Sequence, residues 1–200
     1  MSTTPRFAVL ACLAALSTGS HYAAESALRF VDLRAQGGVT LQDGTTANLT
    51  LMAGDIGSKD KHVISLDADM GIVLGLRGQL AQVTFKRNDG GEDLDMKLGG
   101  GTFLGGLGFF LGPHSHAELV VGYARGVGST TGSHAWDERD TKYTQYVGEF
   151  GWYYTWSNSL QLGIIAGYSL MKVEYDDPLL GTIDGEADGF DASISLGYRF

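Results

Sequence analysis

The chain ends in the stretch Phe190-Asp191-Ala192-Ser193-Ile194-Ser195-Leu196-Gly197-Tyr198-Arg199-Phe200, which has the clearest alternation of apolar and polar residues in the sequence. Apolar residues occupy every second position from Phe190 to Phe200, and small, polar or charged residues fill the positions between them. Successive side chains of a β-strand point to opposite faces. The stretch therefore predicts a strand with one fully apolar face and one polar face.

The same alternation recurs upstream, whereas a helical period is hard to find. The clearest candidate strands lie at about 27–41, 46–55, 63–74, 98–111, 117–125, 143–156 and 160–170. Counting every candidate gives nine strands, but a bacterial barrel with both chain ends on one side of the membrane needs an even number. We expect eight strands, with ten as the alternative. Part of residues 25–42 would then be either leader peptide or merged into the first strand.

The connections between these strands alternate in length. Short ones lie at 112–115 and 157–159, and long polar ones lie at about 87–97, 126–142 and 174–188. Outer-membrane barrels have this asymmetry, with short periplasmic turns and long outer loops. Glycine supplies 30 of the 200 residues, which suits a sheet that bends sharply or closes on itself. The fold class predicted is therefore all-β, an antiparallel up-and-down transmembrane β-barrel.

The N-terminus is typical of a signal peptide. Arg6 is the only charged residue in the first 24, residues 7–16 are apolar, and small polar residues follow. Cleavage is expected after Gly19 or Ala24, which gives a signal peptide at 1–24 and a barrel domain at 25–200. The single cysteine, Cys12, lies in the segment to be removed, and lipoprotein processing at Cys12 is an alternative.

The C-terminal residues also support a resemblance. Phe200, with Tyr198, Leu196 and Ile194 on the same face, resembles the C-terminal signal of outer-membrane barrels, although Ser195 stands where that pattern often has Gly. The mature chain resembles the small eight-stranded barrels: the OmpA membrane domain, OmpX, OmpW and the opacity-type proteins. The resemblance implies a Gram-negative outer-membrane location and assembly by the barrel-assembly machinery through Phe200. It also implies contact with outer-membrane lipids and lipopolysaccharide.

Aromatic residues on the apolar faces are expected to form two girdles, because Tyr and Trp rings favour the boundary between apolar core and head groups. The periplasmic girdle would hold Trp152, Tyr154, Trp156, Tyr198 and Phe200. The outer girdle would hold Tyr123, Tyr143, Tyr146, Tyr168 and Phe190. An ordinary aromatic core is the alternative.

Charged residues on the opposite face are expected to point into the barrel. They are Asp67, Asp69, Lys86, Glu118, Glu149 and Arg199, with Asp32 and Arg34 as further candidates. Buried charges must be paired, and an eight-stranded barrel has an interior just filled by side chains. These residues therefore predict a salt-bridged plug, with a narrow ion or proton path as the alternative.

Several function classes are excluded or disfavoured. The net charge of −9, without a basic stripe, argues against nucleic-acid binding. We expect no cofactor. We also expect no metal site: Asp184-x-Glu186-x-Asp188 resembles the start of a calcium-binding loop, but the Glu that ends such loops is missing. The prediction is a monomeric, non-enzymatic, porin-like protein with a role in envelope integrity, adhesion or limited small-solute passage. The alternatives are a lipid-A-modifying enzyme, using His134 with Ser129 or Ser133, and a soluble periplasmic β-protein.

Overall fold

The computed structural model describes residues 27–40, 44–57, 69–85, 94–132, 139–177 and 181–200. The eight strands in these ranges form one closed antiparallel barrel in which each strand pairs with the next and the last pairs with the first. They are β1 (Ala27–Thr40), β2 (Gly44–Gly57), β3 (Met70–Phe85), β4 (Leu94–Gly112), β5 (Ser115–Gly132), β6 (Arg139–Thr155), β7 (Leu160–Asp177) and β8 (Gly181–Arg199). The described residues contain no helix long and apolar enough to cross a membrane.

This architecture confirms the predicted fold class and the strand number of eight. The alternatives for residues 25–42 are also resolved, because β1 is a full strand that pairs with both β2 and β8. The predicted strand at 63–74 has a different outcome. Its last residues begin β3 at Met70, and residues 63–68 lie outside the described part of the chain. The predicted signal peptide at 1–24 also lies outside it.

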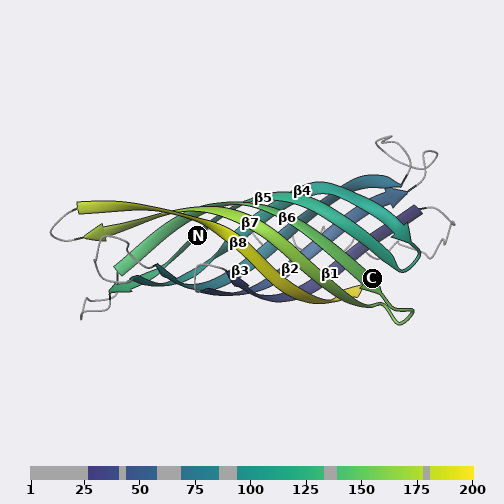
Figure 1. The fold of residues 1–200 in the computed structure, drawn as a ribbon, viewed down its shortest axis with the longest axis horizontal. Helices are drawn as coiled ribbons and strands as arrows, with labels where there is room; N and C mark the ends of the chain where they lie inside the picture. The colour runs from purple at the N-terminus through teal and green to yellow at the C-terminus, as the bar shows by residue number, and fades with distance from the viewer. Residues whose placement is uncertain (1–26, 41–43, 58–68, 86–93, 133–138, 178–180) are drawn as a thin grey trace, which may run out of the picture.

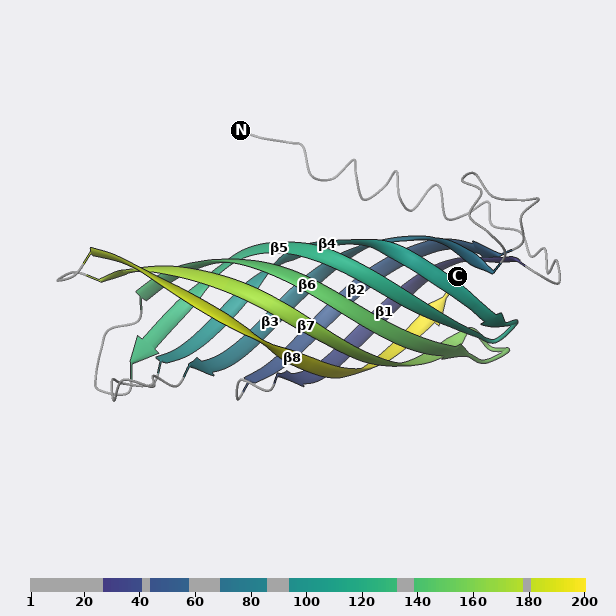
Figure 2. The same ribbon diagram turned by 45° about the horizontal axis from the view of Figure 1, so that its top comes forward.

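The predicted long connections at 126–142 and 174–188 are wrong, because most of these residues belong to strands. β5 continues to Gly132, β6 begins at Arg139, and the β7–β8 pairing extends to Asp177 and Gly181. In Figures 1 and 2, the β7–β8 hairpin projects from the end of the barrel opposite the C-terminus. We call the parts of β4–β8 at this end, residues 94–98, 125–132, 139–144, 171–177 and 181–188, the β-extension.

Close strand contact accounts for part of the high glycine content. A Cβ atom on Gly106 of β4 would lie 2.0 Å from the carbonyl oxygen of Leu119 on β5. A Cβ atom on Gly71 of β3 would lie 1.7 Å from the carbonyl oxygen of Asp55 on β2. Only glycine fits where the backbones of neighbouring strands approach this closely.

Candidate functional site

A buried ion cluster crosses the barrel near the end that holds the C-terminus. Arg34 on β1 donates hydrogen bonds of 2.8 and 2.7 Å to the two carboxylate oxygens of Glu118 on β5. The same guanidinium donates a 2.8 Å hydrogen bond to Asp32, its inward neighbour two residues earlier on β1. The side chains of Arg34, Asp32 and Glu118 are 1%, 0% and 2% exposed. Arg34 therefore links two carboxylates that water hardly reaches.

Three further side chains complete this cluster. Arg199 on β8 donates hydrogen bonds of 2.8 and 2.9 Å to the carboxylate of Asp32. Gln161 donates a 2.8 Å hydrogen bond to the same carboxylate. His116 Nε2 lies 3.0 Å from Glu118 Oε1. Two carboxylates and two guanidinium groups thus balance in charge, as buried ions require.

An aromatic ring covers the central guanidinium. Arg34 Cζ lies 3.9 Å from the ring centroid of Tyr153, in cation–π contact. The rings of Tyr153 and His116 stack with centroids 5.2 Å apart. The lumen at this level is therefore filled by packed side chains.

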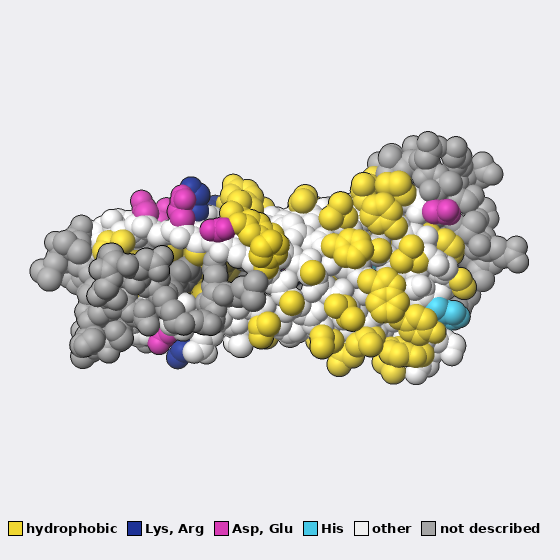
Figure 3. Space-filling view, in the orientation of Figure 1, with side chains coloured by type: hydrophobic (Ala, Val, Ile, Leu, Met, Phe, Trp, Pro, Cys, Tyr) yellow, Lys and Arg dark blue, Asp and Glu magenta, His cyan; other side chains and the backbone are white. Residues whose placement is uncertain are grey.

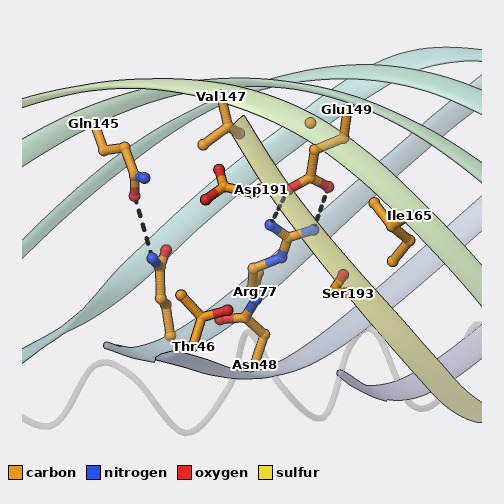
Figure 4. Close-up of a pocket in the computed structure, with 11 residues that line it drawn as sticks. Thr46, Asn48, Arg77, Gln145, Val147, Glu149, Ile165, Asp191 and Ser193 are labelled. Carbon is orange, nitrogen blue, oxygen red and sulfur yellow. Dashed lines mark hydrogen bonds and ion pairs between the residues drawn. The ribbon is translucent and has the colours of Figure 1, made fainter. Parts of the chain in front are cut away.

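A second ion pair fills the middle of the barrel. Arg77 on β3 and Glu149 on β6 form two parallel hydrogen bonds of 2.6 Å each. One layer further along, Gln79 donates a 3.2 Å hydrogen bond to Gln145. Figure 4 shows these two links crossing the lumen. The space beside them, which Asp191 also lines, measures about 30 Å³, enough for about two water molecules.

The lumen at the level of the β-extension is mainly apolar, with Thr130 and Thr141 as buried polar side chains. Its cluster of buried side chains consists of Leu94, Met96, Leu98, Ala124, Tyr143, Met171, Val173 and Tyr175. On β7, the side chains that alternate with this cluster, Lys172, Glu174 and Asp176, are exposed. The β-extension therefore has a mainly apolar interior and a charged exterior.

The rest of the barrel has an apolar exterior, and its interior holds the ion pairs together with a second buried apolar cluster. That cluster consists of Phe30, Met52, Ile56, Val73, Leu104, Val120 and Val147. Exposed apolar side chains cover the outside of this part of the barrel and include Leu76, Phe103, Leu119, Val121, Phe150, Trp152, Ile164, Leu170, Ile194 and Leu196. On the face drawn in Figure 3, hydrophobic side chains cover the middle of the barrel and the end with the C-terminus, and charged side chains gather mainly toward the other end. We call this surface the apolar band. It runs from Leu160 to Leu170 on β7, and from Phe190 on β8 to Phe200, the residue after that strand.

The height of the apolar band follows from strand geometry. Ten residue steps cover roughly 33 Å along a strand. At the tilt of 35–45° usual for such barrels, this length corresponds to a band about 25 Å tall. That height equals the apolar band of outer-membrane barrels.

The predicted girdle residues lie near the two ends of the apolar band. At the C-terminal end, Tyr154 packs edge-on against Trp156, and Tyr198 packs in the same way against Phe200. Trp152 is exposed on the same face. Near the β-extension, the exposed side chains are Tyr123, Tyr146, Tyr168 and Phe190. Tyr168 also donates a hydrogen bond to Asp188.

Tyr143 departs from its predicted place in the outer girdle. It is 3% exposed and packs inside the β-extension. The alternation on β6 explains this position, because odd-numbered residues from Thr141 to Thr155 point inward and even-numbered residues point outward. An aromatic residue at an odd position therefore belongs to the core of the β-extension.

The predicted interior charges have mixed positions. Glu118, Glu149 and Arg199 lie inside the barrel, as do Asp32 and Arg34. Asp69 is exposed in the turn before β3, because that strand begins only at Met70. Asp67 and Lys86 lie outside the described residues.

Two members of the interior were not predicted from the sequence. Arg77 follows Val73 and Gly75 on the inward face of β3, so the alternation continued past residue 74 points to it. His116 falls between the predicted connection at 112–115 and the predicted strand at 117–125, but it is the second residue of β5 and is fully buried. His114 is exposed beside the carbonyl oxygen of Thr155.

The described ranges contain neither a metal site nor the complete set of residues considered for a hydrolase site. No group of three or more His, Cys, Asp or Glu side chains there is placed to hold a metal ion. His134 and Ser133, considered for a hydrolase site, lie outside those ranges, and Ser129 is half-buried on β5.

Comparisons with known proteins find no matching family model and no matching curated protein. Among solved structures, the chain is similar to a major outer membrane protein from Thermus thermophilus, with 12% identity, 86% of this chain and 99% of that chain covered, and a TM-score of 0.46. It is also similar to the outer membrane enzyme PagL, with 17% identity, 84% and 98% covered, and a TM-score of 0.36. The translocator domain of the autotransporter NalP from Neisseria meningitidis has 10% identity, 98% and 97% covered, and a TM-score of 0.38.

Proposed function

We propose that this chain is an integral outer-membrane β-barrel, exported by its N-terminal segment, that crosses the bilayer as a closed, non-enzymatic monomer. The observation that carries the proposal is the reversal of polarity along single strands. On β7, the outward side chains are apolar from Leu160 to Leu170 and charged from Lys172 onward. A soluble barrel has no reason to expose the first set, whereas lipid requires it.

The side chains that fill the lumen bear on the role of the barrel. Hydrogen-bonded ion pairs cross it at two levels, and apolar side chains fill it at a third. The space beside the Arg77–Glu149 pair measures about 30 Å³. This arrangement supports a part in envelope integrity or surface contact over solute passage.

The orientation follows from the two ends of the barrel. We place the end with Phe200 and the tight β4–β5 and β6–β7 turns at the periplasm, and the β-extension on the cell surface. Phe200 is 67% exposed, and its backbone N–H donates a 2.9 Å hydrogen bond to Val31. The exposed ring is accessible to the barrel-assembly machinery, which we propose reads it.

The proposal is tested by gel mobility of the outer-membrane fraction, boiled and unboiled, in detergent. A shift on boiling is expected, because folded barrels of this kind resist detergent until heated. Recovery of the chain as a soluble periplasmic protein, without a shift, would contradict the proposal.

The closed lumen is tested separately in planar bilayers. The wild-type barrel is expected to give no steady conductance. Arg199→Ala, which removes two hydrogen bonds to Asp32, is expected to weaken the heat-resistant fold without creating an open channel. A steady wild-type conductance would favour the ion-path alternative instead.

A further inference from the structure

Arg125 on β5 is an outward-facing cation. It is exposed, and the residues directly opposite it are Gly101 on β4 and Thr144 on β6. No acidic residue occupies a diagonal position on either strand. Within the described ranges, Arg125 makes no ion pair or hydrogen bond, whereas Lys172 pairs with Glu186 at 2.5 Å.

Arg125 lies at the boundary between the apolar band and the β-extension. Two residues nearer the centre of the band, the rings of Tyr123 and Tyr146 lie side by side with centroids 5.2 Å apart. Tyrosine pairs at this position mark the level of lipid head groups. Arg125 therefore points toward head groups and not toward acyl chains.

Other donors surround this guanidinium. Lys142 on β6 occupies the position diagonal to Arg125, at a separation of about 7–8 Å between Cα atoms. Thr144, directly opposite Arg125 and two residues from Lys142 on β6, belongs to the same outer face. Lys142 faces Glu174 on β7 and follows Asp140 on its own strand, so Arg125 is the principal cation.

Two adjacent positions on the outer surface beside Arg125 are glycines, which carry no side chain. Gly101 on β4 and Gly78 on β3 are paired neighbours on the outward face. A Cβ atom on Gly78 would have no atom within 4 Å, and one on Gly101 would approach only a backbone oxygen at 3.9 Å. Exposed Leu76, Leu80 and Phe103 rise around these glycines. The arrangement leaves room for an acyl chain next to the cation.

We propose that Arg125, Lys142 and Thr144 bind a phosphate of lipid A, the phosphorylated anchor of lipopolysaccharide, and that one of its acyl chains lies over Gly78 and Gly101. The proposal rests on the outer-membrane location proposed above. Charge complementarity supports it, because guanidinium binds phosphate through two parallel hydrogen bonds. The Tyr123–Tyr146 pair sets the phosphate at the boundary where the acyl chains of lipid A begin.

Native mass spectrometry of the full-length barrel in detergent, titrated with diphosphoryl lipid A, tests this site. Arg125→Gln is expected to weaken retention about tenfold or more, because a hydrogen bond to a charged group contributes about 1.5–3 kcal/mol. Lys172→Gln removes the same charge from a cation already neutralised by Glu186 and is expected to change nothing. Gly78→Leu is expected to weaken retention, and Gly37→Leu, at an equally open outward position on β1, is not.

Two further probes identify the ligand. Lipid A stripped of phosphate is expected to lose the difference between wild type and Arg125→Gln. Equal retention of diphosphoryl lipid A by these two proteins, or stronger retention of phosphatidylglycerol than of lipid A, would overturn the assignment. Heat-modifiable mobility is measured on the same samples, so a barrel that folds without binding lipid A disproves this site alone and leaves the proposed location standing.

Discussion

The two parts of β7 have the same alternation and opposite polarity. From Leu160 to Leu170 the outward side chains are apolar, and the inward ones include Gln161 and Ser169. Beyond Leu170 the inward side chains are apolar and the outward ones are charged. One strand therefore matches lipid outside and polar groups inside over one part, and water outside and an apolar core over the other. The solvent outside the barrel decides the polarity of the outer face, whereas the inner face of the first part holds apolar as well as polar side chains, as at Ile165.

The largest effect is expected in the polar interior of the barrel, at Arg34. Arg34→Met is expected to lower the free energy of unfolding by about 3–5 kcal/mol, because it leaves Glu118 buried without its cation. Urea unfolding in lipid vesicles, followed by tryptophan fluorescence, measures this. The matched control is Arg29→Met on the same strand, where the side chain is 64% exposed and a change within about 0.5 kcal/mol is expected. Equal effects of the two variants would mean that water reaches the cluster.

This contrast also explains what could be predicted from the sequence. Alternation alone fixes the strands of the apolar band, because lipid outside and polar groups inside leave a strict pattern, as from Phe190 to Phe200. The β-extension keeps the alternation but reverses its polarity, so its charged residues resemble those of loops. Lys172, Glu174 and Asp176 indicate a loop only when the intervening Met171, Val173 and Tyr175 are ignored.

The interior pairs could not be predicted in the same way. The alternation along its strand predicts that Glu118 points inward. Its contact with Arg34, however, depends on the register of the eight strands around the barrel. Residues on β1 and β5 meet across the lumen, and no local sequence signal records that distance of 84 positions. The tilt and stagger that bring them together are properties of the closed barrel.

The apolar interior of the β-extension is tested at Met96, which is 1% exposed. Met96→Ala is expected to lower the free energy of unfolding by about 2–5 kcal/mol through lost burial and the cavity left behind. Lys97→Ala, the adjacent outward substitution on β4, is expected to have little effect on the same urea transition. A negligible effect of Met96→Ala would show that the interior of the β-extension is not packed.

The outer surface is tested by placing a lysine on each part of β7. Ile164→Lys, at a position 59% exposed in the apolar band, is expected to cost about 2–4 kcal/mol, because it places an ammonium group against lipid. Asp176→Lys, outward on the β-extension, is expected to cost less than about 0.5 kcal/mol. Both are measured by urea unfolding in vesicles, with the folded fraction read from heat-shifted gel mobility. Similar costs at the two positions would contradict the placement of the lipid boundary at Leu170.

The smallest effect is expected at the ion pair between Lys172 and Glu186, whose side chains are 65% and 74% exposed. Lys172→Met is expected to leave the urea midpoint unchanged, although the two groups lie as close together as Arg34 and Glu118 do. Water screens the exposed pair and hydrates either partner when the other is lost, so little free energy depends on their contact. In the lumen, water cannot hydrate the remaining partner when the other is lost. A destabilisation at Lys172 as large as that at Arg34 would mean that the hairpin surface is covered by another part of the chain or by lipid, and the division of β7 at Leu170 would have to move outward.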